Sequence, residues 1–207
     1  MGLLAGAVSG CGPLQPTGAR ILDYHAQACL TSIETFTRRL YAKNPKYEPN
    51  PAKRREKLEQ LLADQGPAGE LRHKTSDALL TAAFAKDSAG ADRVYLLGLG
   101  LVKSIREAYG LGPGKILVTG MQVPLERLQR LHHNISQVNW RLKTYRDDSG
   151  DLLFQTNAAG ENGYINMGYE VLMTQILTRI QDDIHLRGGL PGKYAFDMSA
   201  FFLSILL

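Results

Sequence analysis

The stretch Val94-Tyr95-Leu96-Leu97-Gly98-Leu99-Gly100-Leu101-Val102 carries no charged side chain, and wound as a helix it is apolar on every side. Nine residues cannot cross a bilayer, which needs about 20. The stretch therefore predicts a central buried helix, running from about Ala91 to Tyr109 and ending at Gly110. Gly98 and Gly100 would let a neighbouring helix approach closely, because glycine has no side chain to hold it away.

Helical patterns flank this centre on both sides. Residues 21–43 place apolar side chains at steps of four and three, which is one face of a helix. Asn50-Pro51 is typical of a second helix start, with a capping side chain followed by a proline. Ser76 is expected to cap a third helix. Further helices are expected over residues 124–145 and 165–187, with a short apolar one at 197–207. The expected fold is mostly α, a bundle of about six helices.

Residues 140–157 allow two interpretations. Leu128, Ile135 and Leu142 are seven residues apart, which favours a helix reaching about Tyr145. The alternative is a β-hairpin, with one strand from Trp140, a polar turn at 147–150 and a second strand after it.

Length and composition limit the class of protein. The chain has 207 residues, 44% of them hydrophobic and 21% charged, with two cysteines. These values are close to the average for a globular protein and exclude a disordered chain, a collagen, a polytopic membrane protein and a disulfide scaffold. One folded domain over residues 20–207 is expected.

The positive charge is concentrated in one window. The chain carries a net charge of +4, but residues 38–57 alone carry +6, so the rest carries −2. Such a patch can bind an anionic partner, or can be the solvated ends of two helices that meet at a turn. The eight basic residues of this basic window are Arg38, Arg39, Lys43, Lys46, Lys53, Arg54, Arg55 and Lys57.

The N-terminus carries the most specific motif. Ten uncharged residues precede Cys11, and a segment with prolines and glycines, 12–18, follows it. The run Val8-Ser9-Gly10-Cys11 resembles the lipobox of bacterial lipoproteins, in which a signal peptidase cuts before the cysteine and the thiol receives a lipid. No lysine or arginine occurs before Arg20, so the positive region of a signal peptide is missing from this stretch.

The lipobox resemblance implies three parts. Residues 1–10 would be a signal-peptide remnant, 11–19 a lipidated cysteine with a flexible tether, and 20–207 the helical domain. Because Gly12 is not an aspartate, the resemblance implies the outer membrane, with the domain on the periplasmic face. Cys29 lies on the apolar face of its helix and is expected to be buried and inert.

Candidate chemistry is sparse. The glycines at 110–114 lack the spacing of a phosphate-binding loop, because only three residues separate Gly110 from Gly114-Lys115 and Ile116 stands where a hydroxyl is needed. Asp182, Asp183 and His185 could meet His132 and His133 if the two long helices pack antiparallel, but helix-surface polar residues are the simpler interpretation. We expect no catalytic residues, no metal site and no cofactor.

Three function classes follow. The first is a membrane-anchored bacterial cell-envelope lipoprotein, held by a lipid (palmitate among its acyl chains) on Cys11, with a non-catalytic helical domain that binds another envelope protein. The second is a cytoplasmic helical module that binds nucleic acid or another anionic partner through the basic window. Nucleic acid is the less favoured partner, because no recognition motif is present. The third is an enzyme of unknown class.

Overall fold

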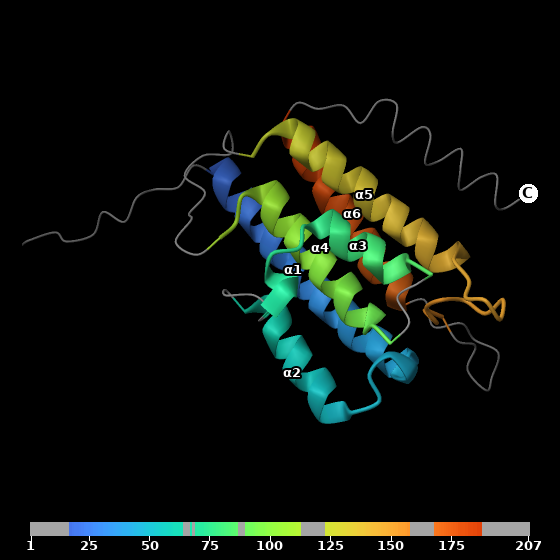
Figure 1. Ribbon diagram of the computed structural model, residues 1–207. Coiled ribbons are helices and arrows are strands. Elements are labelled where there is room, and N and C mark those ends of the chain that lie inside the picture. Colours follow the sequence, from blue (N-terminus) through green and yellow to red (C-terminus); the bar gives the residue numbers. More distant parts are fainter. Residues whose placement is uncertain are drawn as a thin grey trace, which may run out of the picture.

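The computed structural model describes residues 17–63, 67, 69–86, 90–112, 123–157 and 168–187, and shows a bundle of helices (Figure 1). No strand occurs in these ranges. The α-helices are α1 (Thr17–Lys43), α2 (Pro51–Leu62), α3 (Ser76–Phe84), α4 (Arg93–Tyr109), α5 (Leu125–Thr144) and α6 (Gly168–Leu186), and the 3-10 helices are η1 (Pro45–Tyr47) and η2 (Gly69–Arg72). The predicted mostly α fold is confirmed.

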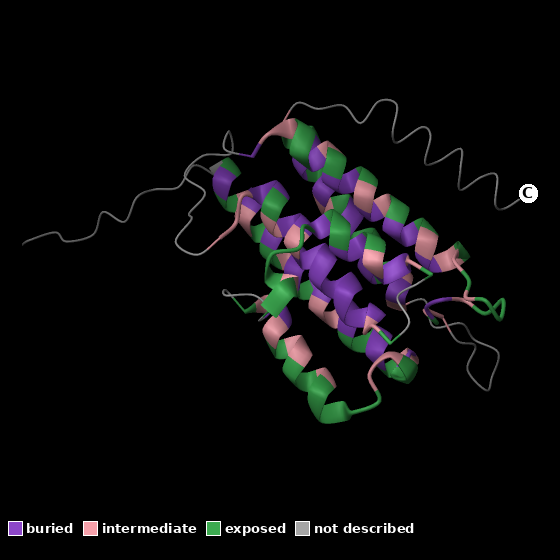
Figure 2. Ribbon diagram, viewed as in Figure 1, coloured by how far each residue is buried: buried purple, intermediate pink, exposed green. Residues whose placement is uncertain are grey.

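Helix α4 is the centre of the bundle, as its sequence predicts. All of its residues are buried except Lys103, Arg106 and Glu107, and purple runs along its length in Figure 2. It contacts α1 and α3 extensively and also touches α2 and α5, while α6 packs on α1 and α5. The apolar stretch 94–102 is therefore covered by other helices, which removes its side chains from water.

The two glycines of α4 are where its neighbours come closest. A Cβ at Gly98 would lie 2.6 Å from Oγ1 of Thr37 in α1, and one at Gly100 would lie 2.8 Å from Leu80 of α3. Real Cβ atoms do not approach other atoms so closely, so any side chain would push α1 or α3 away. The expected role of both glycines is confirmed.

Helix ends follow the local signals with one difference. Asn50 caps α2, its Oδ1 accepting from the amides of Ala52 and Lys53, and Gly110 ends α4 at φ +68°. The cap of α3, however, is Thr75, whose hydroxyl accepts from the amide of Ala78 at 3.2 Å. Ser76 was expected there, but its hydroxyl donates to Glu107 instead, at 2.5 Å.

The hairpin alternative over 140–157 is wrong, because α5 continues as a helix through Thr144. Leu142 is buried there and continues the apolar helix face that includes Val138. A strand starting at Trp140 would interrupt this face. A tight turn follows, closed by a single antiparallel bridge between Arg146 and Leu152. Oδ1 of Asp147 accepts from the amides of Ser149 and Asp151, which stabilises this turn.

Helix α1 begins at Thr17, so residues 17–19 belong to the bundle rather than to the expected tether. Cys29 is fully buried, and burial raises the pKa of its thiol to about 12, in agreement with an unreactive cysteine. Cys11 and the expected helix at 197–207 lie outside the described residues. Among the described helices, none combines the length and the apolar character needed to cross a membrane.

The close contact at Gly98 gives a stability prediction. Gly98→Ala should lower the free energy of unfolding by about 1–3 kcal/mol, because the new methyl group overlaps the buried side chain of Thr37. Urea unfolding followed by circular dichroism measures this. In a Thr37→Ala background the loss should shrink, since the overlapping atoms are gone.

Gly18→Ala is the matched control, because a Cβ at Gly18 meets nothing within 4 Å. It should leave stability unchanged or raise it by up to about 1 kcal/mol. A Gly98→Ala protein as stable as the wild type would show that α1 does not depend on this contact.

Candidate functional site

The basic window folds into two helices and the turn between them. Arg38, Arg39 and Lys43 lie on the last turns of α1, Lys46 lies in η1, and the other four lie on α2. Helix α2 buries only Leu61 against the bundle, so the rest of it is green or pink in Figure 2. The basic window thus lies where the end of α1 and the start of α2 meet at a turn, which is the arrangement expected if its charges are solvated helix ends.

Lys57 already has partners inside the protein. Its ammonium lies 2.7 Å from Glu48 and 2.8 Å from Asp92, the residue that caps α4. Although burial lowers the pKa of Lys57, its hydrogen bonds to these two carboxylates prevail and raise the pKa above the ordinary value. Tyr41 of α1 also donates to Asp92, at 2.6 Å. Lys57 therefore joins α2 to the start of α4.

The other cations of the window divide into two groups. Lys46 approaches Asp147 at 3.4 Å, Arg54 donates to the carbonyl of Pro49, and Arg39 donates to the carbonyl of Gly168 at 3.3 Å. The remaining four form no ion pair or side-chain hydrogen bond within the described part of the chain. These four are Arg38, Lys43, Lys53 and Arg55.

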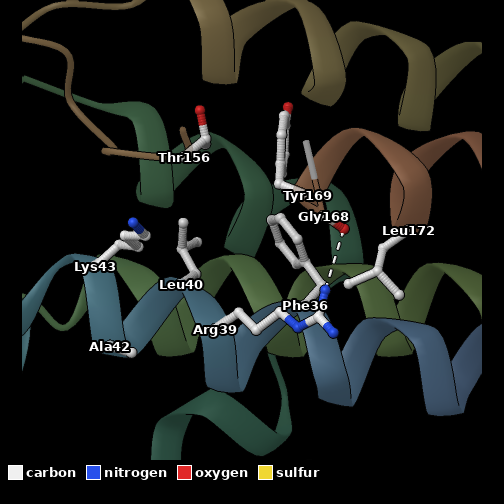
Figure 3. Close-up of a pocket in the computed structure, with 9 residues that line it drawn as sticks. All are labelled: Phe36, Arg39, Leu40, Ala42, Lys43, Thr156, Gly168, Tyr169 and Leu172. Atoms are coloured by element: carbon white, nitrogen blue, oxygen red, sulfur yellow. Dashed lines mark hydrogen bonds between the residues drawn. The ribbon is translucent and has the colours of Figure 1, made fainter. Parts of the chain in front are cut away.

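A cavity of about 340 Å³ opens between α1 and α6, beside the end of the basic window (Figure 3). Two cations, Arg39 and Lys43, extend from α1 at its rim, and Thr156 lies on the opposite side. Its floor is apolar and consists of side chains that are at most 9% exposed. These floor residues are Phe36, Leu40, Tyr169 and Leu172.

Contacts of its floor residues, and of the residue next to them, hold the cavity in shape. The hydroxyl of Tyr169 donates to Oδ1 of Asn139 in α5 at 2.8 Å, and the ring packs against Phe36 with centroids 5.6 Å apart. The neighbouring carboxylate, Glu170, pairs with Lys143 of α5 at 3.0 Å. The hydroxyl of Tyr169 and the carboxylate of Glu170 are therefore engaged with α5, and the two charged side chains that line the cavity, Arg39 and Lys43, are both positive.

A buried polar cluster lies at the other end of α1. Oδ1 of Asp183 is 2.6 Å from Nδ1 of His25, and Oδ2 accepts from the hydroxyl of Tyr109 at 2.5 Å. Asp183 is fully buried, so one carboxylate joins α1, α4 and α6. Of these three residues only Asp183 is a candidate from the sequence, and its expected partners there are His132 and His133. The sequence does hold one indication that Asp183 is buried. It follows Ile176 by seven residues and Ile180 by three, which places it on the apolar face of α6.

The histidine arrangement considered from the sequence does not form. Asp183 faces His25 rather than His132. Burial lowers the pKa of His132, which favours its neutral form. Within the described ranges no three side chains among histidine, cysteine, aspartate and glutamate are placed to hold a metal ion.

Comparison of the chain with family models, with curated proteins and with solved structures finds no match.

The buried carboxyl of Asp183 gives a pH prediction. Burial raises the pKa of Asp183 above its ordinary 3.8, although the hydrogen bonds from Tyr109 and His25 act in the opposite direction. A carboxyl with a raised folded pKa stabilises the fold fully below pH 3.8, and this contribution falls as the pH rises through the folded pKa. The difference in the free energy of unfolding between the wild type and Asp183→Asn should therefore shrink as the pH rises from 3.8 through the folded pKa of Asp183.

Urea unfolding at a series of pH values measures this difference. Asp148→Asn, at an exposed turn position, is the control and should change stability at pH 7 by less than about 0.5 kcal/mol. A wild-type advantage that grows with pH would mean that the ionised carboxylate, not the protonated one, is the favoured buried form.

Proposed function

We propose that this chain is a membrane-anchored bacterial cell-envelope lipoprotein whose helical domain binds another envelope protein and performs no catalysis. The observation that carries the proposal is the run Val8-Ser9-Gly10-Cys11, which has the small residues and the cysteine of a lipobox. The lipid on Cys11 would hold the bundle at the periplasmic face of the outer membrane.

The position of the bundle supports this proposal. Helix α1 begins at Thr17, six residues after Cys11. An extended segment of that length spans about 20 Å at most, so the anchored bundle would stay close to the headgroups of the bilayer. A lipidated cysteine of this kind carries several acyl chains, and more than one chain is what stable anchoring requires.

Metabolic labelling tests the anchor. The protein, expressed in bacteria from the start of its own gene, should incorporate labelled palmitate, and Cys11→Ser should abolish the label because no other residue fits the motif. Cys29→Ser is the matched control and should keep the label, since Cys29 is fully buried in the bundle. Absence of label from the wild type, or its persistence in Cys11→Ser, would refute the lipoprotein assignment.

The unpaired cations favour a second candidate function, a module that binds an anionic partner through the basic window. Arg38, Lys53 and Arg55 are exposed and have no partner among the described residues. Exposed cations that are not neutralised by neighbours attract polyanions over about a Debye length.

Salt dependence tests this second candidate. Binding of a fluorescent DNA duplex, measured by anisotropy, should weaken steeply as salt rises, because each phosphate contact releases a counterion. Replacing Arg38, Lys53 and Arg55 by glutamine should reduce the salt slope by about 1 for each lost contact. Binding that does not weaken as salt rises, or that is unchanged in the triple variant, would contradict this second candidate.

A further inference from the structure

We propose that the cavity between α1 and α6 binds a small carboxylate with an apolar chain, the carboxylate between Arg39 and Lys43 and the chain on the apolar floor. This inference is independent of the lipid anchor, because it concerns only the folded bundle. It assigns a ligand class to two of the eight cations of the basic window.

The two cations line the same cavity from one helix, and in Figure 3 their charged ends lie on either side of Leu40. Arg39 and Lys43 are four residues apart on α1, so they lie one above the other on the same face of the helix. A guanidinium has five N–H donors, and Arg39 uses one of them, on the carbonyl of Gly168 at 3.3 Å. Lys43 has no partner among the described residues. Two positive groups with free donors at one rim suit an anion with two acceptor oxygens.

The surroundings do not cancel this charge. Glu170, the acidic residue of α6 next to the floor residue Tyr169, is paired with Lys143 at 3.0 Å. The floor side chains Phe36 and Leu40 offer no polar atom, and the hydroxyl of Tyr169 is bonded to Asn139. The rim is thus cationic and the floor apolar, which selects an anionic head and an uncharged body.

The size of the cavity sets the size of the ligand. A volume of about 340 Å³ lies at the small end of the range for small-molecule sites. A chain of about eight carbons fits that volume, whereas a protein helix does not. Removing the chain from water against Leu40 and Leu172 would supply affinity, and the carboxylate would fix the orientation.

Calorimetric titration of the full chain with octanoate tests the proposal. Octanoate should bind saturably, while octan-1-ol and octylamine, which have the same chain, should bind at least about tenfold more weakly. In amide NMR spectra of the octanoate complex, the largest shifts should fall on α1 around Leu40 and on α6 around Leu172. These measurements use the wild-type protein, so they do not depend on a variant that folds.

The double variant Arg39→Gln with Lys43→Gln should weaken octanoate binding at least about tenfold. Arg38→Gln, at the adjacent exposed position that does not line the cavity, is the matched control and should bind as the wild type does. No saturable binding at millimolar octanoate, equal binding of octan-1-ol, or unchanged binding by the double variant would each overturn the proposal. These outcomes are separate from palmitate labelling, which tests the anchor alone.

Discussion

The close approach of α1 and α3 to the glycines of α4 is the constraint on which the bundle depends. A helix that is apolar on all sides must be covered on all sides, and Gly98 and Gly100 let Thr37 and Leu80 come within contact of its backbone. The other helices then take the positions left to them: α2 and α5 also reach α4, and α6 fills the space between α1 and α5. The cavity at Arg39 lies in this last layer, where α6 meets α1 away from the central helix.

Each end of the bundle carries a buried or partly buried carboxylate that accepts from a tyrosine. Asp92 accepts from Tyr41 and Lys57, and Asp183 accepts from Tyr109 and lies against His25. Such groups contribute little net stability when satisfied, but they are costly to leave unpaired, so they favour one arrangement of helices over alternatives that bury the same apolar surface.

Local patterns predicted the helices, because their causes lie within a few residues. The apolar steps of α1, the Asn50 cap and the left-handed Gly110 could all be derived from the sequence. The polar cluster and the cavity could not, because His25 meets Asp183 across 158 residues and the cavity floor joins Phe36 to Leu172. The same reason explains the hairpin alternative: whether residues 140–144 stay helical is decided by the burial of Leu142 against other elements.

The two tyrosine–carboxylate hydrogen bonds also fix the position of α1 along the axis of α4. Contacts between apolar side chains tolerate sliding of one helix along another, whereas a hydroxyl hydrogen bond is lost within about 1 Å. Tyr41 near the end of α1 meets the cap of α4, and His25 near the start of α1 meets the partner of Tyr109 at the end of α4. The two helices therefore run antiparallel, with a hydrogen-bonded contact near each end. A shift of α1 by one turn, about 5.4 Å, would break both contacts, so these hydrogen bonds set the axial register of the two helices.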